Sequence, residues 1–251
     1  MALAAWRREA HPWRLTALFF LLAGGLGGLV LALGLASGSP VEYAIRGALT
    51  DLRAFPDYAD VVQRFHEQSM VPYAYQNGIY ALPETMDFRA LFYRTDVLEE
   101  YGIRVPDSWE EIYKTVLPVL YRNNLQFFVP ADYTTFLLQH GGTFYTEDAL
   151  KTALDTPQAY DAFKEYTELF TSYGIPVSAN FYMRMRTGEM PMGIGSYGDY
   201  IMLKTAAPEL MGRWAMAPVP GRLLEDGSVD RTVGGIASTA CVIMDGAASA
   251  E

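Results

Sequence analysis

A loop with two carboxylates follows Pro83 and is the first candidate for ligand chemistry. Glu84 and Asp87 stand in this loop with Thr85 and Met86 between them. A loop carboxylate can accept hydrogen bonds from the hydroxyl groups of a ligand, and such charge-assisted bonds are stronger than neutral ones. The sequence therefore predicts Glu84 as a ligand contact.

A glycine-rich run, Gly193-Ile194-Gly195-Ser196-Tyr197-Gly198, is the second candidate. Its spacing fits G-x-G-x-x-G, and it lies between a predicted strand over 190–194 and a predicted helix over 200–207, where a loop presents backbone N–H groups at a helix N-terminus. A dinucleotide site needs an acidic residue about 20 positions later, but that stretch reads Ala217-Pro218-Val219-Pro220. The run therefore predicts either a loop that offers N–H groups and the Tyr197 ring to a polar ligand, or a tight turn that needs glycine.

Aromatic residues are plentiful, with 17 Tyr, 13 Phe and 4 Trp. Tyrosine offers a flat apolar face that can stack on a sugar ring and a hydroxyl group that can form a hydrogen bond. The aromatic residues at predicted junctions between loops and regular elements are Tyr133, Phe144, Tyr145, Tyr197 and Tyr200. A predicted helix over 157–173 has an aromatic face that is predicted to be core instead. That face consists of Tyr160, Phe163, Tyr166, Leu169 and Phe170.

No motif in the sequence builds a catalytic or metal site. The histidines, His11, His66 and His140, stand apart in the sequence and are predicted to be surface or hydrogen-bonded residues. Cys241 is the only cysteine, which excludes an internal disulfide and a cysteine-based zinc site. The sequence contains no His-Glu-x-x-His, no P-loop and no Gly-x-Ser-x-Gly. We therefore predict a protein that is not an enzyme and that needs neither a metal nor a cofactor.

Helix and strand signals alternate along the body, which indicates an α/β fold. Asn77-Gly78 predicts a two-residue hairpin turn, and a strand is predicted over 90–93. A helix over 95–101 is predicted to end at Gly102, and the next helix is capped by Asp107 or Ser108 and kinked or interrupted at Pro118. The remaining predicted elements are helices over 57–67 and 133–140 and strands over 126–130 and 214–219.

An apolar run precedes this body. Residues 15–36 carry no charge, and a helix of that length spans about 33 Å, enough for a hydrocarbon core of about 30 Å. Three arginines, Arg7, Arg8 and Arg14, precede the run, and the next basic residue is Arg46. The positive-inside rule then places the N-terminus in the cytoplasm and the body on the extracytoplasmic side.

The domain prediction is therefore a basic N-terminus over 1–14, a single transmembrane helix over 15–36, and an extracytoplasmic body over 37–251 that begins with a linker over 37–40. A cleaved signal peptide is the alternative, because the small residues Ala36-Ser37-Gly38-Ser39 could be a cleavage site. Either alternative exports the body.

The charge balance excludes one class of partner. The chain has 29 acidic and 19 basic residues, for a formal net charge of −10. No stretch rich in lysine and arginine breaks this balance, so the body repels nucleic acid. Nucleic-acid binding is therefore excluded.

Four blocks of sequence occur in an order that is typical of one protein family. They are residues 80–84 with 90–96, residues 103–110, residues 188–197, and residues 217–221 with Gly234-Gly235. Together they resemble the bacterial extracellular solute-binding proteins that serve carbohydrate ABC transporters, relatives of the maltose-binding protein. The resemblance spans roughly residues 41–244.

This resemblance implies a periplasmic-binding-protein-like fold of type II, in which two α/β lobes close over a ligand through a hinge. It also implies a non-catalytic receptor that passes a sugar or oligosaccharide to the permease subunits of an ABC transporter. Tyr197 stands where an aromatic ring stacks on the sugar. Hydrogen bonds to ligand hydroxyls are expected from Ser196, Asp199 and Glu84. The candidate contacts are completed by Tyr133 and by Gly234 and Gly235, where the backbone could approach the ligand.

The chain departs from the family pattern at both ends. Family members begin with a strand–helix–strand unit that builds the first lobe, and here the apolar run takes its place. The chain also ends at Glu251, before the helices that usually complete the fold. We therefore expect an incomplete binding domain with exposed strand edges.

Two other functions fit the same residues. One is an enzyme of the cell envelope, either a hydrolase that uses carboxylates or a dinucleotide-binding enzyme that uses residues 193–198. The other is a degenerate binding fold that acts as a sensory or interaction module.

Overall fold

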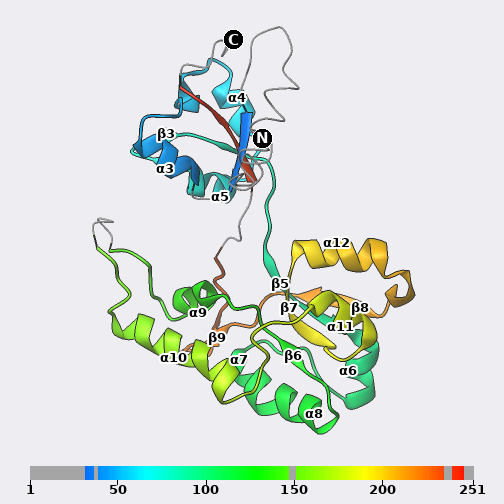
Figure 1. Cartoon of the computed structure of the whole chain (residues 1–251). Coiled ribbons are helices and arrows are strands. Elements are labelled where there is room, and N and C mark those ends of the chain that lie inside the picture. Colours follow the sequence, from blue (N-terminus) through cyan, green and yellow to red (C-terminus); the bar gives the residue numbers. More distant parts are fainter. Residues whose placement is uncertain (1–31, 37–38, 147–150, 235–238, 246–251) are drawn as a thin grey trace, which may run out of the picture. The chain divides into compact units, whose positions relative to one another are not determined.

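The computed structural model describes residues 32–36, 39–146, 151–234 and 239–245, which belong to two compact units (Figure 1). Unit 1 comprises Met1–Met86 and Ala237–Glu251, and unit 2 comprises Asp87–Ile236. Each unit has its own sheet and its own buried core. The α/β class predicted from the sequence is therefore confirmed.

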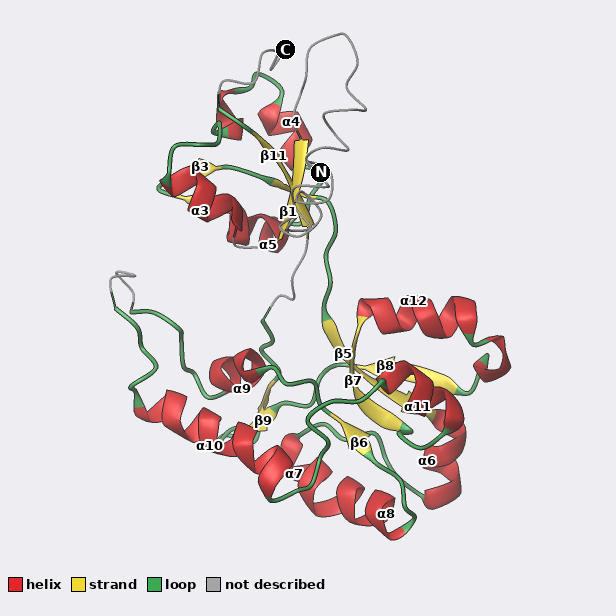
Figure 2. Ribbon diagram, viewed as in Figure 1, coloured by secondary structure: helices red, strands yellow, loops and turns green. Residues whose placement is uncertain are grey.

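Unit 1 is built on a three-stranded antiparallel sheet in the order β1-β11-β4 (Figure 2). The strands are β1 (Ala32–Ala36), β11 (Thr239–Ile243) and β4 (Leu82–Pro83). Helical segments are α3 (Ser39–Ile45), η1 (Leu52–Ala54), α4 (Tyr58–Val62), α5 (Glu67–Met70) and η2 (Val71–Tyr73). The core of unit 1 contains Leu49, Tyr73, Ala81, Ala240 and Val242.

The predicted hairpin is present, but its turn is shifted by one residue, from Asn77-Gly78 to Gln76-Asn77. Strands β2 (Ala74–Tyr75) and β3 (Gly78–Ile79) are antiparallel, and both turn residues, Gln76 and Asn77, have positive φ values. Positive φ at both central positions is the type I′ geometry, whose twist matches that of the flanking strands.

The helix predicted over 57–67 is wrong in its extent, because α4 ends at Val62 and His66 caps a separate helix, α5, by accepting a hydrogen bond from the Gln68 N–H.

The predicted transmembrane helix over 15–36 is corrected at its C-terminal end. Residues Ala32–Ala36 form strand β1, which pairs with the whole of β11 from Ala32↔Ile243 to Ala36↔Thr239. A physical reason is that β11 is the middle strand of its sheet and carries buried residues, so the edge opposite β4 needs backbone partners, which β1 supplies along its whole length. The predicted linker over 37–40 is also wrong in part, since α3 begins at Ser39.

Residues 15–31 of the predicted span lie outside the described part of the chain. Among the described residues, no helix is both long enough and apolar enough to cross a membrane. The apolar run that was expected to replace the opening strand–helix–strand unit of the family contributes strand β1 at its end, and α3 follows that strand.

Unit 2 is built on a four-stranded sheet in the order β6-β7-β5-β8. Strand β5 (Arg89–Arg94) is antiparallel to β7 (Met192–Ser196) and to β8 (Trp214–Ala217), and β6 (Phe127–Phe128) is parallel to β7. A separate ribbon pairs β9 (Arg222–Leu223) with β10 (Val229–Asp230). The α-helices are α6 (Thr95–Tyr101), α7 (Trp109–Glu111), α8 (Leu117–Arg122), α9 (Tyr133–Gln139), α10 (Pro157–Thr171), α11 (Phe181–Thr187) and α12 (Tyr197–Ala206). A π-helical segment, η3 (Ile112–Val116), precedes α8, and a 3-10 turn, η4 (Pro208–Leu210), follows α12.

Both faces of this sheet are buried. Successive residues of β5 point to opposite faces, so Leu91 joins one hydrophobic cluster while Ala90 and Phe92 join the other. Strand β7 supplies Met192 and Ile194 to the first cluster. A sheet that is buried on both faces needs helices on both sides, which agrees with the alternation of strands and helices along the sequence.

The start and end signals of two helices agree with the structure. Gly102 ends α6 with a φ of 64°, and the Ser108 hydroxyl caps α7 by accepting a hydrogen bond from the Glu111 N–H at 3.3 Å. The regular α-helix is also interrupted just before Pro118, as predicted. The π-helical segment η3 separates α7 from α8, and Pro118 lies in the first turn of α8, where a residue that has no N–H to donate is tolerated.

The predicted core face of α10 is wrong at its N-terminal end. Leu169 is buried and Tyr166 and Phe170 pack against the core, but Tyr160 and Phe163 are 69% and 54% exposed. Helical periodicity identifies an apolar stripe, but it does not report how far a neighbouring element extends along that stripe.

Candidate functional site

Several strand ends meet at one edge of the sheet in unit 2. Strands β6 and β7 are parallel and β5 runs the other way, so the carboxyl ends of β6 and β7 lie beside the amino end of β5. Arg89 pairs with Ser196 in the register of β5 and β7. Ligands of α/β proteins commonly bind outside the carboxyl ends of strands, which makes this edge the candidate site.

Ser196 and Asp199 form a capping box at the start of α12. The Gly198 N–H donates to Ser196 Oγ at 3.1 Å, and the Ser196 N–H donates to Asp199 Oδ2 at 2.8 Å. The helix therefore begins at Tyr197, three residues before its predicted start. Within the described part of the chain these bonds leave the Ser196 hydroxyl hydrogen and Asp199 Oδ1 for a ligand.

Tyr197 is held by Asp87, the first residue of unit 2. Asp87 Oδ1 accepts hydrogen bonds from the Tyr197 N–H at 2.7 Å and from the Phe88 N–H at 2.9 Å. The rings of Phe88 and Tyr197 lie 5.3 Å apart, and those of Tyr197 and Tyr200 stack at 5.2 Å with 11° between their planes. Because Phe88 and Tyr197 are 46% and 39% exposed, this edge presents aromatic surface to solvent.

Arg89 and Asp132 place a donor and an acceptor at the same edge. Arg89 Nε lies 3.9 Å from Asp132 Oδ2 and is buried without a hydrogen-bond partner among the described residues. It borders a cavity of about 10 Å³ that is also lined by Trp109 and Thr135. That volume is close to the space one water molecule needs. Asp132 Oδ1 caps α9 by accepting from the Thr134 N–H at 3.0 Å.

Sequence reasoning did not single out Arg89 or Asp132 as site residues, and it preferred Glu84 to Asp87. Their sequence signals are ordinary, namely an arginine that starts a strand and an aspartate that precedes a helix. Only the pairing of β5, β6 and β7 brings them to one edge.

Tyr133 points toward the interior of unit 2. Its hydroxyl donates to the Ala159 carbonyl at 2.7 Å, and its ring contacts those of Phe144, Phe163 and Tyr166. Burial raises the pKa of this hydroxyl. A ligand contact by Tyr133 stays a prediction, and it would have to use the ring.

Gly234 lies against the start of α9. A Cβ atom at this position would stand 2.7 Å from Thr134 Cγ2, so only glycine allows the approach. This places Gly234 near Asp132, at the candidate edge. Gly235 lies outside the described residues.

Glu84 belongs to unit 1. Its N–H donates to the Thr239 carbonyl at 2.8 Å, and its exposed side chain lies near Cys241. Burial, with a contribution from the Glu84 charge, raises the pKa of the Cys241 thiol. The structure therefore groups Ser196, Tyr197 and Asp199 around Asp87, and it assigns Glu84 to the other unit.

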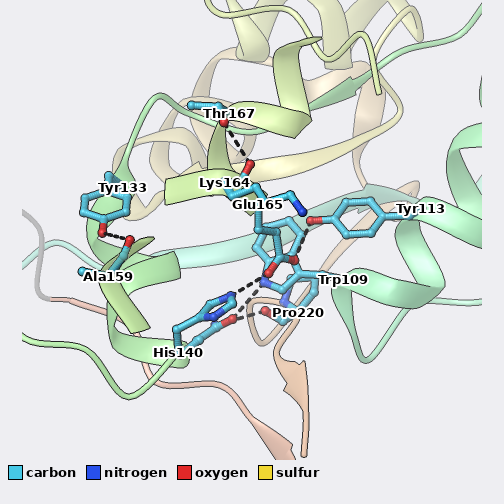
Figure 3. A network of polar contacts seen from close by, with 10 residues as sticks. Trp109, Tyr113, Tyr133, His140, Ala159, Lys164, Glu165, Thr167 and Pro220 are labelled. Carbon is cyan, nitrogen blue, oxygen red and sulfur yellow. Dashed lines mark hydrogen bonds and ion pairs between the residues drawn. The ribbon is translucent and has the colours of Figure 1, made fainter. Parts of the chain in front are cut away.

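A polar network behind the edge fixes α9 in place (Figure 3). Trp109 Nε1 donates to Gln139 Oε1 at 2.8 Å, and Gln139 Nε2 donates to the Pro220 carbonyl at 3.2 Å. Glu165 lies 2.7 Å from His140 Nε2 and accepts from the Tyr113 hydroxyl at 2.9 Å. Burial, together with the Glu165 carboxylate, raises the pKa of Tyr113. The network satisfies its own polar groups, so His140 is the hydrogen-bonded residue that was predicted.

The arrangement is suited to binding a hydroxylated molecule. It combines exposed aromatic rings with carboxylate acceptors and a guanidinium donor. The residues that the structure describes include no group of three His, Cys, Asp or Glu side chains able to hold a metal ion. Gly193 and Gly195 lie inside strand β7, where a Cβ would meet Phe128, Phe181 or Phe92 within 3 Å, so the first half of the glycine motif packs aromatic rings and forms no phosphate loop.

One family model, described as bacterial extracellular solute-binding protein, matches residues 22–239. No curated protein sequence matches the chain. Solved structures of similar fold include the GacH receptor of Streptomyces glaucescens, solved unliganded and with acarbose. Its identity to this chain is 20% and its TM-score 0.70, over 96% of this chain and 63% of the receptor.

Two further structures are similar to the same degree. A solute-binding protein of an ABC transporter from Thermotoga lettingae, bound to α-D-tagatose, has 22% identity and a TM-score of 0.67 over 85% of this chain and 58% of that one. UgpB from Mycobacterium tuberculosis, in complex with glycerophosphocholine, has 19% identity and a TM-score of 0.69 over 93% and 60%. These likenesses confirm the predicted periplasmic-binding fold of type II, and the chain spans less than two thirds of each of these structures.

Proposed function

Because this chain belongs to the bacterial extracellular solute-binding proteins, we propose that it binds an uncharged sugar or oligosaccharide and delivers it to the permease of an ABC transporter. The GacH and Thermotoga structures carry sugar-like ligands by name, which supports this ligand class. The candidate edge holds Asp87, Asp132 and Asp199 against a single guanidinium, that of Arg89. An excess of negative charge disfavours anionic ligands.

The observation that carries the proposal is the exposed pair of rings, Phe88 and Tyr197, beside hydrogen-bonding groups at the sheet edge. In this proposal Tyr197 stacks on a sugar ring. Ser196 donates to a ligand hydroxyl and Asp199 Oδ1 accepts from one. Arg89 and Asp132 supply a further donor and acceptor. Contacts by Glu84, Tyr133, Gly234 and Gly235 stay predictions.

Replacement of the stacking ring tests the proposal. We expect Tyr197→Ala to weaken sugar binding by about tenfold, equivalent to about 1.4 kcal/mol, because an aromatic stacking contact contributes energies of this order. Isothermal titration calorimetry of the full chain against a panel of mono-, di- and trisaccharides measures the effect.

Tyr160→Ala is the matched control. Tyr160 is an exposed tyrosine on α10, a helix that contributes no residue to the candidate edge, and its loss should leave affinity unchanged. Absence of binding by any sugar in the wild-type chain, or equal losses in the two variants, would contradict the proposal.

We also propose that the apolar segment over 15–31 carries the body across the membrane and leaves the N-terminus on the cytoplasmic side. The support is the uncharged run itself and the arginines Arg7, Arg8 and Arg14 before it. Since Ala32–Ala36 belong to the sheet of unit 1, the membrane segment of this proposal ends before Ala32.

A further inference from the structure

A small cavity of unit 2 lies beside the residues of the candidate edge. Its volume is about 10 Å³, which is about the space that one water molecule needs. Its apolar walls include the buried side chains of Trp109, Phe136 and Ile194. A cavity with apolar walls alone stays dry, so the polar residues on the wall decide whether this one holds water.

Arg89 brings an unpaired donor to this cavity. Its Nε is buried and has no hydrogen-bond partner among the residues that the structure describes. Asp132 Oδ2 lies 3.9 Å from Nε, which is too far for a direct hydrogen bond. A buried donor without a partner costs free energy, and more so when it belongs to a charged group. Native structures satisfy most such donors with protein groups or with ordered water.

Asp132 and Thr135 offer the other hydrogen-bonding groups of the wall. Asp132 Oδ1 accepts from the Thr134 N–H at 3.0 Å, which leaves Oδ2 as an acceptor. Thr135 is buried, and within the described ranges its hydroxyl forms no hydrogen bond. A hydroxyl can both donate and accept. The wall therefore presents a donor, an acceptor and a group that can be either, which matches the roughly three hydrogen bonds of a typical buried water.

We propose that this cavity binds one ordered water molecule. The water accepts a hydrogen bond from Arg89 Nε, donates one to Asp132 Oδ2 and pairs with the Thr135 hydroxyl. Thr135 is thereby a positioning residue, which holds Arg89 and Asp132 in place through the water and does not itself contact a ligand. The water site stands without the proposed function, whereas its effect on sugar affinity rests on that function.

The water fixes two side chains that the proposed function uses. The Arg89 and Asp132 side chains are 20% and 28% exposed, so each has a part that a ligand can reach. Among the described residues the two Nη groups of Arg89 form no hydrogen bond, so they remain for a ligand while Nε binds the water. Side chains that are already held in place lose less conformational entropy when a ligand binds, which raises affinity.

Substitution of Thr135 tests the water site. Thr135→Val replaces the hydroxyl by a methyl group of similar size and removes one partner of the water. Thr135→Ser keeps the hydroxyl and is the conservative variant. Thr171→Val is the matched control, since Thr171 is an exposed threonine of α10 that does not line the cavity.

Crystal structures of the full chain and of each variant are combined with calorimetric titrations. The probe is the sugar that the wild type binds most tightly among the mono-, di- and trisaccharides of the panel. We expect a water in the wild type within about 3.2 Å of Arg89 Nε, Asp132 Oδ2 and the Thr135 hydroxyl. Thr135→Val should lack this water and bind the sugar about fivefold more weakly, equivalent to about 1 kcal/mol. Thr135→Ser and Thr171→Val should keep the water and an affinity within about twofold of the wild type.

The other outcomes overturn the inference in distinguishable ways. If sugar binds but the wild-type cavity holds no ordered water, the water site is wrong while the proposed function stands. If Thr135→Val keeps both the water and the affinity, or loses affinity with the water still in place, Thr135 does not act through the water. If no sugar of the panel binds the wild type, the proposed function fails and the effect on affinity falls with it, while the crystal structures still decide the water site.

Discussion

Asp87 accepts hydrogen bonds from the N–H groups of Phe88 and Tyr197, and it thereby ties the start of β5 to the start of α12. Glu84 stands three residues earlier in the same loop, and its residue type is as suitable for a ligand contact. The two carboxylates nevertheless belong to different units, because the chain leaves unit 1 after Met86. Residue type alone does not distinguish them.

A comparable residue-scale effect in unit 1 is the cap formed by Asp51. Its carboxylate accepts from the Arg53 N–H at 3.1 Å and the Ile79 N–H at 3.2 Å, and it pairs with the Arg53 guanidinium at 2.7 Å. We expect Asp51→Ala to lower the free energy of unfolding by about 1 kcal/mol, the usual effect of losing an N-cap. Thermal unfolding of the full chain at pH 7 measures the loss.

Asp57→Ala is the control for this substitution. Asp57 stands at the N-cap position of α4 but makes no capping hydrogen bond through its side chain, so its loss should be close to neutral. Equal destabilisation by the two substitutions would contradict the role given to Asp51.

The contribution of Asp51 also depends on pH. The hydrogen bond from Arg53 is the main reason that the pKa of this carboxyl is lowered from 3.8 to about 2. A lowered pKa stabilises the folded state above the unfolded value, and the stabilisation disappears as pH falls through the folded value. The stability difference between wild type and Asp51→Ala should therefore be constant above about pH 5 and shrink between about pH 4 and pH 2.

At the scale of elements, strand β1 differs most from the sequence-based prediction, because its residues were expected to form the end of a membrane helix. The run Ala32-Leu33-Gly34-Leu35-Ala36 is apolar and uncharged, so it suits a membrane helix and a buried strand equally well. Pairing with β11 determines that this run forms a strand. β11 offers five consecutive pairing positions, and strand pairing satisfies backbone groups that would otherwise be left open.

Two deletions test this element. Removal of residues 1–31 leaves β1 in place, whereas removal of residues 1–36 exposes one edge of β11. Amide hydrogen exchange of residues 239–243 should therefore stay slow in the first deletion and become faster by at least about tenfold in the second, as expected when a backbone hydrogen bond is opened to water. Equal protection in both deletions would show that β1 does not support the sheet.

At the scale of the whole molecule, the chain is an acidic member of an extracellular binding family with an apolar segment before its first strand. The mature protein tests how far that segment extends. We expect intact-mass measurement of the protein from its native host to place the mature N-terminus at or before Ala32, because later cleavage would remove β1 from the sheet. A mature chain that begins at Ser37 or later would contradict this. A mass that includes residues 1–14 would support an anchor, and one that lacks them a cleaved signal peptide.

Local signals in the sequence were sufficient for much of the fold. The cap at Ser108, the stop at Gly102 and the strand around Leu91 all depend on residues close in sequence, and each is present in the structure. The hairpin predicted at Asn77-Gly78 is present too, with its turn one residue earlier. The four spaced blocks of sequence were likewise sufficient to predict the family, because together they reflect the order of several strands and helices along the chain. Tyr197 was identified as a candidate ligand contact because it is an aromatic residue that follows a glycine-rich strand.

Only the tertiary structure decided which side chains share the site edge. Arg89, Asp132 and Ser196 come from distant parts of the chain, and the order β6-β7-β5 brings them together. It also decided that Glu84 belongs to the other unit, that Tyr160 is exposed, and that Ala32–Ala36 form a strand. The physical reason is the same in each case. Short-range preferences set how a segment folds, but its partners, its burial and its neighbours depend on residues that are remote in sequence.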